Sequence, residues 1–293
     1  MGHKAGFVNI IGSPNVGKST LMNALVGERL SIITSKAQTT RHRIMGIVSD
    51  DDCQIVYSDT PGVLNASYKM HEAMMKFVHT ALADADILLV ITDVFETKMN
   101  NEQILEKLKD IDTPVMLLIN KVDLVNQEKV LDRMEFWKVQ LPKAEIHAVS
   151  ALHEFNLEIV LSQIKKMLPE SPAFFDKDEM TDKSMRFFVT EIIREKILEN
   201  YTKEIPYSCE VVCEAYKDEG HIVHIRAEII VMRDTQKGII IGHKGERLKK
   251  VGTDSRIDIE KFIDNKVFLD LHVRVDKDWR DKENKLKKYG YTQ

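Results

Sequence analysis

Residues 12–19, GSPNVGKS, have the spacing of glycine, lysine and serine found in loops that bind nucleotide phosphates. Such a loop turns its backbone N–H groups inward around a β-phosphate, and Gly12 and Gly17 supply backbone conformations that other residues resist. Lys18 would reach the β- and γ-phosphates, and Ser19 would hold Mg²⁺. The residues expected to form this phosphate site are Gly12, Ser13, Asn15, Val16, Gly17, Lys18, Ser19 and Thr20.

Two further segments, NKVD at 120–123 and SAL at 150–152, predict that the base is guanine. Asp123 can accept from both N1–H and the 2-amino group of guanine, a pair of donors that adenine does not present. NKVD also follows a buried strand at its carboxyl end, where ligands bind in sheets of this kind. Asn120 would brace the loop, and the stem of Lys121 would cover the face of the base. The residues expected around the base are Asn120, Lys121, Asp123, Ser150, Ala151 and Leu152, with the Ala151 amide directed at guanine O6.

Two segments between the phosphate loop and NKVD are expected to sense the γ-phosphate. In DTPG, residues 59–62, Asp59 would hold Mg²⁺ through a water molecule and the Gly62 amide would bond the γ-phosphate. In KAQTTRHR, residues 36–43, one threonine hydroxyl would ligate Mg²⁺ only when the γ-phosphate is present, which would make the segment an order–disorder switch. The predicted metal ligands are Ser19, Asp59 and either Thr40, which we favour, or Thr39.

The C-terminal part of the chain carries another motif, G-x-x-G at residues 242–245, between an apolar run and a basic amphipathic stretch. In KH domains such a loop joins two helices and clamps about four nucleotides through its backbone and its positive charge. The glycines let the chain approach phosphates because no Cβ stands in the way. We expect RNA rather than DNA, because KH grooves suit unstacked single strands. The predicted RNA contacts are Ile241, Gly242, His243, Lys244, Gly245, Arg247, Lys249 and Lys250.

The elements that must position these motifs change pattern along the chain. In residues 1–168, short β-rich runs alternate with helical stretches, which predicts an α/β domain with a mostly parallel, doubly wound sheet. This is the fold class of a P-loop GTPase domain. Strands are expected at 6–12, 53–59, 86–93, 115–120 and 145–150, and helices at 19–27, 70–84, 101–110 and 128–141.

A segment at 169–183 with two prolines, many charges and no period is predicted to be a linker. After it, residues 184–293 are predicted to form a smaller α+β domain, a type II KH domain with a basic C-terminal tail. Its expected elements are a helix at 185–201, strands at 207–217 and 221–232, helical segments around 245–264 and a strand at 267–275.

The composition fits two domains and excludes a membrane-spanning protein. Hydrophobic residues make up 43% and charged residues 30% of the 293, and no apolar run approaches the ~20 residues that span a bilayer. The N-terminus lacks the apolar segment of a secretory signal, so we expect a cytoplasmic location with three reduced cysteines. Residues 236–293 hold 15 basic and 10 acidic residues, a net charge of +5. Because the net charge of the whole chain is −4, residues 1–235 carry −9. A basic end on an acidic chain suggests a polyanion partner for that end.

Taken together, these motifs make the whole chain resemble the Era family of bacterial GTPases. The resemblance implies a GTP-gated protein of 30S ribosomal subunit assembly, whose KH domain binds single-stranded RNA at the 3′ end of 16S rRNA. It also implies GTP, GDP and Mg²⁺ as ligands and peripheral contact with the inner membrane, and no obligate protein partner is inferred. The sequence segments on which the resemblance rests span residues 12–291 and are GSPNVGKST, KAQTTRHR, DTPG, NKVD, SAL, RFFVTEIIREKIL, IIIGHKGERLKKVG and VDKDWRDKENKLKKYGY.

The residue after Gly62 is Val63, where the small signalling GTPases carry a glutamine that orients the attacking water. An aliphatic side chain cannot polarise water, so we expect slow GTP hydrolysis with Val63 packed away. The negative charge that develops in the transition state must then be stabilised by an arginine finger in trans or by a potassium ion. In GTPases that resemble this one, an asparagine at the place of Asn15 helps to hold that ion; the alternative is that Asn15 only bonds the loop backbone. The predicted catalytic residues are Asn15, Lys18, Thr40, Asp59 and Gly62.

The leading prediction is an enzyme that acts as a switch, in which GTP orders residues 31–45 and the Asp59 loop and thereby favours RNA binding. The rival is a constitutive RNA-binding assembly factor whose nucleotide site is only structural. The intact γ-phosphate-sensing residues favour the switch, because a structural site need not keep them. Asp254, Asp258 and Asp264 are expected to share the helix after G-x-x-G, which predicts modest non-specific affinity for RNA.

Overall fold

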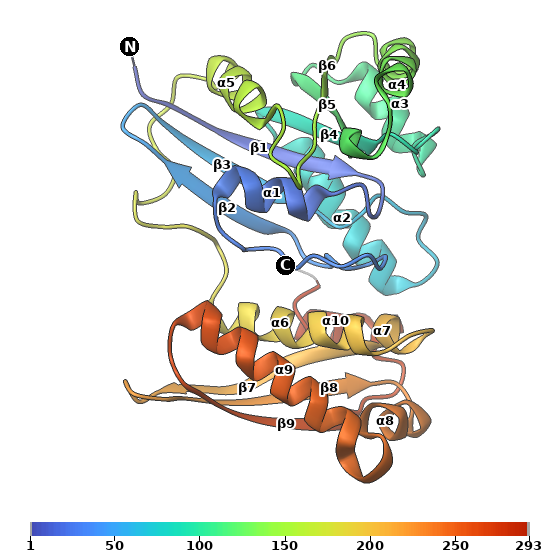
Figure 1. Cartoon of the computed structure of the whole chain (residues 1–293), viewed down its shortest axis with the longest axis vertical. Helices are drawn as coiled ribbons and strands as arrows, with labels where there is room; N and C mark the ends of the chain where they lie inside the picture. The colour runs from blue at the N-terminus through green and yellow to red at the C-terminus, as the bar shows by residue number, and fades with distance from the viewer. Residues whose placement is uncertain (1, 292–293) are drawn as a thin grey trace. The chain divides into compact units, whose positions relative to one another are not determined.

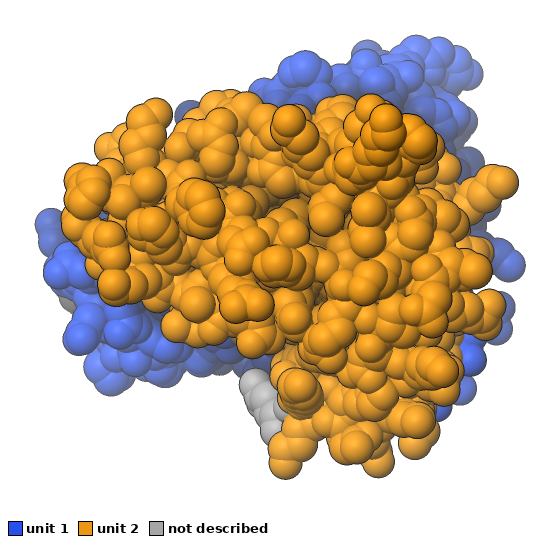
Figure 2. All heavy atoms as spheres, turned by 90° about the horizontal axis from the view of Figure 1, so that it is seen from below, with its two compact units in different colours: residues 1–67, 71–182 blue, residues 68–70, 183–293 orange. Residues whose placement is uncertain are grey.

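The protein forms two compact units, described here in a computed structural model that covers residues 2–291. The first unit runs to Ser67 and includes His71–Asp182, and the second comprises Tyr68–Met70 and the chain from Lys183 onward. Figure 1 shows the elements of each unit, and Figure 2 colours the two units separately. Each unit has its own sheet, so each is described by itself.

The first unit is built on a six-stranded sheet in the order β2-β3-β1-β4-β5-β6. β2 is antiparallel to β3, and every other pair is parallel, as expected for a doubly wound sheet. The predicted fold class is confirmed. The strands are β1 (Lys4–Gly12), β2 (Ile44–Ser49), β3 (Cys53–Asp59), β4 (Ile87–Asp93), β5 (Val115–Asn120) and β6 (Glu145–Ala148).

Helices cover both faces of this sheet because its central strands are apolar on both sides; all seven residues of β3 and of β4 are buried. Side chains of α2, α3 and α4 share one apolar cluster with the sheet, and α1 crosses the other face (Figure 1). The helices are α1 (Lys18–Val26), α2 (Lys69–Ala83), α3 (Glu102–Asp110), α4 (Gln127–Gln140) and α5 (Leu157–Met167). The sequence had not predicted β2 or α5.

The carboxyl ends of four strands place the predicted nucleotide motifs side by side. β1 ends at Gly12 and β3 at Asp59, and these two strands are paired in parallel. β4 ends at Asp93 opposite Asn120, the last residue of β5. The loops that follow these strands therefore emerge at one edge of the sheet.

The segment predicted as a linker pairs with the first unit through Asp182. The backbone N–H groups of Phe174 and Phe175 donate to Gln54 Oε1 at 2.7 and 3.0 Å, and Gln54 Nε2 donates back to the Phe175 carbonyl. Farther along, Ile47 N donates to the Met180 carbonyl at 2.8 Å on the edge strand β2. The chain thus satisfies backbone groups of an exposed sheet edge before it enters the second unit.

The second unit has a three-stranded sheet in the order β7-β8-β9, in which β7 is antiparallel and β9 parallel to β8. Its order of helix, two strands, two helices and strand is that of a type II KH domain. The elements are α6 (Met185–Asn200), α7 (Ile205–Ser208), β7 (Cys209–Asp218), β8 (Val223–Val231), α8 (Asp234–Ile241), α9 (Glu246–Ile263), β9 (Val267–Val275), η3 (Trp279–Asp281) and α10 (Glu283–Lys288).

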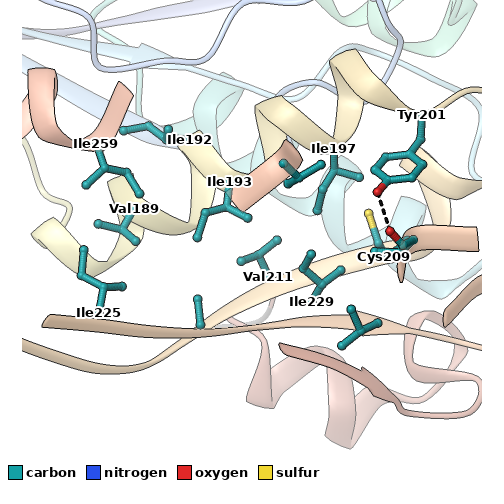
Figure 3. Packing of buried hydrophobic residues seen from close by; sticks show 14 of the residues in the cluster. Val189, Ile192, Ile193, Ile197, Tyr201, Cys209, Val211, Ile225, Ile229 and Ile259 are labelled. Carbon is teal, nitrogen blue, oxygen red and sulfur yellow. Dashed lines mark hydrogen bonds between the residues drawn. The ribbon is translucent and has the colours of Figure 1, made fainter. Parts of the chain in front are cut away.

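The core of the second unit lies between α6, α9 and one face of the sheet (Figure 3). Val189, Ile193 and Ile197 on α6 follow helical spacing and pack with Ile229 of β8. The Tyr201 hydroxyl, at the end of α6, donates to the Ile240 carbonyl at 2.7 Å. This bond ties the end of α6 to the end of α8, the helix that leads into the G-x-x-G loop.

The C-terminal tail completes this unit. Trp279 is fully buried and donates through Nε1 to the Ser208 carbonyl at 3.2 Å. Leu286 and Tyr291 are also buried, and the Tyr291 hydroxyl bonds the Glu210 carboxylate. The large apolar groups of the tail are therefore used inside the unit. Among residues 2–291, no helix is long and apolar enough to cross a membrane.

Candidate nucleotide and RNA sites

A cavity of about 550 Å³ opens at the carboxyl edge of the six-stranded sheet. It is bounded by the phosphate loop, the segment before β2, the DTPG loop and the two base motifs. Of the residues predicted to bind nucleotide, those on its wall are Asn15, Gly17, Lys18, Ser19, Thr20, Gly62, Asn120, Lys121, Asp123, Ser150 and Leu152, joined by the switch residue Thr40.

Glycines at two positions of the phosphate loop are required by close packing. A Cβ on Gly12 would collide with the Ile91 carbonyl of β4, so the loop could not leave β1 along this path. Gly17 has φ 103°, and a Cβ there would collide with Asn120 Nδ2. The same Asn120 Nδ2 donates to the Val16 carbonyl at 2.8 Å, so the base motif braces the phosphate loop. Gly12 and Val16 thus shape the loop from behind the cavity wall.

Lys18 is buried within the loop that it serves. Its Nζ donates to the carbonyls of Gly12 and Ser13 at 3.2 and 2.7 Å. Burial lowers the pKa of Lys18 to about 8, and the nearby carboxylates of Asp59 and Glu96 only partly offset this. A phosphate group beside the ammonium would favour the charged form and raise this pKa again. The Lys18 ammonium is therefore positioned to bind an anionic phosphate group.

Three oxygen-bearing side chains meet where Mg²⁺ was predicted. Ser19 Oγ donates to Asp59 Oδ2 at 2.7 Å and lies 2.9 Å from Thr40 Oγ1, which is 3.3 Å from the same carboxylate oxygen. Asp59 Oδ1 is buried and accepts no hydrogen bond from the described residues. Burial raises the pKa of Asp59, and the Lys18 charge and the hydroxyls counter it. Two hydroxyls and a carboxylate suit a hard divalent cation, so these residues fit Mg²⁺.

The structure distinguishes the two candidate threonines. Thr39 Oγ1 lies 2.7 Å from Thr34 Oγ1 and donates to the Lys36 carbonyl at 2.6 Å, so it closes a turn inside its own loop. Thr40 instead turns its hydroxyl toward Ser19 and Asp59. The geometry therefore supports Thr40 as the metal ligand.

At the base end of the cavity, Asn120 connects two motifs. Its Oδ1 accepts from the Ala151 amide at 2.9 Å, which holds SAL against NKVD although 31 residues separate them. Ser150 Oγ donates to Asp123 Oδ1 at 2.6 Å and fixes the carboxylate predicted to read guanine. Ala151 is 2% exposed, whereas Leu152 is 73% exposed on the cavity rim.

Val63 lies away from the reacting region. It is fully buried in the apolar cluster with Ile11 and Val78, and its amide donates to the Gly12 carbonyl at 2.9 Å. A Cβ on Gly62 would press against Pro14, so the DTPG loop packs directly on the phosphate loop. The Val63 side chain therefore cannot act on a water molecule, as the sequence predicted.

Some residues of the cavity wall were not predicted as contacts. Most of them belong to residues 31–45, the segment expected to be ordered by GTP, in which only Thr39 and Thr40 had been assigned a contact. The residues not predicted are Pro14, Ile32, Ile33, Thr34, Ser35, Gln38 and Leu124. Leu124 directly follows NKVD, so proximity to that motif was an available signal for it.

The G-x-x-G loop joins α8 to α9, as predicted for a KH domain. Gly242 has φ 73° and Lys244 φ 47°, so the chain turns sharply between the helices. A Cβ on Gly242 would collide with the aliphatic stem of Arg247. His243 and Lys244 are exposed at the tip, and Ile241 packs against the core below.

Beside this loop, a groove of about 370 Å³ runs between α9 and β9. Its wall combines apolar and basic groups and includes two predicted RNA contacts, Gly245 and Lys249. The residues that the sequence did not identify are Leu248, Gly252, Thr253, Arg256, Leu269 and Leu271. They come from a helix and a strand whose pairing only the fold reveals. Such a groove suits bases that leave their stack while the G-x-x-G loop holds the backbone.

Two aspartates of α9 are paired with lysines. Asp254 lies 2.6 Å from Lys250 Nζ, one helical turn away. Asp258 lies 2.7 Å from Lys196 Nζ of α6 and 3.4 Å from Lys261. Lys250, a predicted RNA contact, therefore shares its charge with a carboxylate, in keeping with modest non-specific affinity.

A P-loop GTPase domain followed by a type II KH domain is the class of protein that this fold and these sites define. Residues 7–121 match the family described as 50S ribosome-binding GTPase, and residues 204–280 match the KH domain family. The chain is 44% identical to GTPase Era of Syntrophus aciditrophicus (strain SB) over 99% of its own length and 96% of that protein. The chain belongs to the Era family of GTPases.

Two solved structures of Era resemble this chain throughout. One is Era in complex with MgGDPNP and nucleotides 1506–1542 of 16S ribosomal RNA, with a TM-score of 0.95 and 36% identity. The other is a variant of Aquifex aeolicus Era bound to GDP·AlF4⁻, with a TM-score of 0.94 and 36% identity. Each comparison covers 99% of this chain and 100% of the other.

Proposed function

We propose that this GTPase uses its nucleotide state to control binding of single-stranded RNA at the 3′ end of 16S rRNA during 30S subunit assembly. The observation that carries the proposal is the meeting of Ser19, Thr40 and Asp59 in one buried cluster. Thr40 comes from the switch segment and Asp59 from the DTPG loop, so an Mg²⁺ ion and a γ-phosphate would tie both segments to the phosphate loop. The RNA itself is inferred from the Era complex with 16S rRNA.

The cavity residues have separate tasks in this proposal. Lys18 and the loop amides hold the β- and γ-phosphates, and Ser19, Thr40 and Asp59 hold Mg²⁺, which neutralises charge on the transferred phosphoryl group. The Gly62 amide positions the γ-phosphate. Asp123 selects guanine. The single N–H of Ala151, predicted to face guanine O6, donates to Asn120 Oδ1 instead. The second unit supplies the RNA site with its G-x-x-G loop and the groove along α9.

Nucleotide control of RNA binding can be tested on the full chain. A fluorescent oligonucleotide with the 16S 3′-end sequence is titrated with protein loaded with GDP or with a non-hydrolysable GTP analogue. We expect affinity at least about tenfold higher with the analogue, within the usual range of coupling between sites. A scrambled oligonucleotide is the control for sequence preference. Equal affinities in both states would favour the rival, a constitutive RNA-binding factor with a structural nucleotide site.

We propose that a potassium ion near Asn15 stabilises the negative charge that develops during GTP hydrolysis, because Val63 cannot do so. Asn15 lies on the cavity wall with a left-handed backbone, φ 65°, next to the phosphate-binding residues. A cation there would stabilise negative charge on the leaving oxygens. GTP hydrolysis should therefore be severalfold faster in KCl than in NaCl at equal ionic strength. Asn15→Ala should remove this difference while GDP binding persists.

The comparison of KCl with NaCl distinguishes a bound potassium ion from a group supplied in trans as the source of the stabilising positive charge. Equal hydrolysis rates in both salts would leave Asn15 as a turn residue. A group supplied in trans, such as an arginine finger, would then be the better explanation for hydrolysis.

Peripheral contact with the inner membrane stays a prediction that depends on the charge of the tail. Trp279, Leu286 and Tyr291 are buried in the second unit. Lys285 bonds Asp276, which leaves the exposed Lys282, Lys287 and Lys288 as the basic groups of the tail that would face an anionic surface.

A further inference from the structure

Asp93 is the last residue of β4 and has not been assigned a role by the motifs. Its carboxylate is only 13% exposed, and it is not among the residues that line the nucleotide cavity. The register of the sheet places it opposite Asn120, directly before Lys121. A carboxylate this well buried is stable only when its oxygens are paired, so its partners indicate what it does.

The two oxygens of Asp93 have different partners. Oδ1 accepts from the backbone amides of Phe95 and Glu96 at 2.9 and 3.0 Å and closes a turn after β4. Oδ2 accepts from Lys121 Nζ at 2.7 Å. The same ammonium donates to the Asn15 carbonyl at 2.7 Å. A single ammonium therefore joins a rigid strand end to the phosphate loop.

This arrangement fixes a side chain that would otherwise be mobile. Lys121 has a left-handed backbone, φ 62°, and a stem with four rotatable bonds on the cavity wall. With its ammonium held between Asp93 and Asn15, the stem is ordered before a nucleotide arrives. The entropy of ordering it is then lost on folding rather than on binding, which favours tight binding.

We propose that Asp93 is a positioning residue for nucleotide binding, which holds the Lys121 ammonium against the Asn15 carbonyl. In this way Asp93 fixes the position of the Lys121 stem beside the base and the path of the phosphate loop. Asp93 reaches the nucleotide site through Lys121, and neither side chain belongs to the cluster of Ser19, Thr40 and Asp59 that would sense the γ-phosphate. GDP and GTP should therefore depend on it equally. The inference rests on the nucleotide site of the proposed function.

The test is Asp93→Asn, measured by the dissociation rate of fluorescent GDP and of a fluorescent non-hydrolysable GTP analogue. The amide oxygen of asparagine can still accept from the turn amides, but its NH₂ group offers Lys121 no acceptor. We expect both nucleotides to dissociate about tenfold faster, the scale of one charge-assisted hydrogen bond. If this variant does not fold, Asp93→Ser replaces it, because a serine hydroxyl can serve the turn and is too short to reach Lys121.

Asp50→Asn is the matched control. Asp50 pairs with Lys165 at 2.6 Å, and it lies before β3, at the opposite edge of the sheet from the cavity. Asp50→Asn removes a lysine–carboxylate pair, more exposed than that of Asp93 and Lys121, without touching the nucleotide loops. The dissociation rates of this variant should stay within about twofold of the unchanged protein.

A double-mutant cycle decides whether Asp93 acts through Lys121. In a Lys121→Met background, Asp93→Asn should change GDP dissociation by less than about twofold. A full effect in that background, or wild-type dissociation rates for Asp93→Asn alone, would overturn the proposal. Failure of the unchanged protein to bind guanine nucleotides would instead contradict the proposed function, so the two failures are distinguishable.

Discussion

Changing His243 and Lys244 together to Asp should lower RNA affinity at least about 100-fold while basal GTP hydrolysis stays near that of the unchanged protein. Both side chains are exposed at the tip of the G-x-x-G loop. The change removes a lysine charge and places two carboxylates against the RNA backbone, which loses favourable counterion release and adds repulsion. Anisotropy titration with the 16S 3′-end oligonucleotide measures affinity, and phosphate release measures hydrolysis.

The chain offers a control with the same change of charge. Lys217 and His221 are exposed near the turn between β7 and β8. That turn precedes β8, whereas the G-x-x-G loop lies beyond the other end of this nine-residue strand. Changing Lys217 and His221 to Asp should leave RNA binding almost intact. If RNA binding survives in the His243 and Lys244 variant, the assignment of the G-x-x-G loop is wrong.

Two elements of the first unit, β2 and α5, were not predicted from the sequence, and α7 and α10 of the second unit were not predicted either. β2 is a short edge strand interrupted by Gly46, which weakens a strand pattern. The glycine is needed because a Cβ there would press on Val26 and Met22 of α1. α5 was overlooked although its signals are present, since Asn156 is a typical N-cap residue type and Leu157, Val160 and Ile164 follow at helical spacing.

Contiguous motifs could be recognised in the sequence because their chemistry requires fixed spacing. The phosphate loop and NKVD are of this kind. Thr40 and Ser19 were predicted to share one Mg²⁺ ion although 21 residues separate them, because each lies in a recognised motif. The pair of Lys121 and Asp93, 28 residues apart, was not predicted, because Asp93 belongs to no motif and only the fold brings it to Lys121. The hydrogen bonds between the Gln54 amide and residues 174–175 were not predicted either, because the sequence indicated only a linker there.

Replacing Asp123 with Asn should weaken GTP binding by roughly 1.5 to 3 kcal/mol, the scale of a hydrogen bond to a charged group. Ser150 Oγ donates to Asp123 Oδ1 at 2.6 Å and limits how the side chain can turn. An asparagine that keeps this bond through its oxygen would direct its NH₂ group at the guanine donors, so two donors would face each other. Isothermal titration of the nucleotide-free protein with GTP measures the loss.

Xanthosine triphosphate provides the decisive comparison, because it has a carbonyl where guanine has its 2-amino group. The NH₂ group of the introduced asparagine would donate to that carbonyl, so the Asp123→Asn protein should bind xanthosine triphosphate more tightly than GTP. Asp132→Asn, on the exposed surface of α4, removes one negative charge from the same unit and should keep the preference for GTP. General damage to the cavity would weaken both nucleotides alike. Reversal of the preference requires that Asp123 itself reads the base, and unchanged GTP affinity would show that it does not.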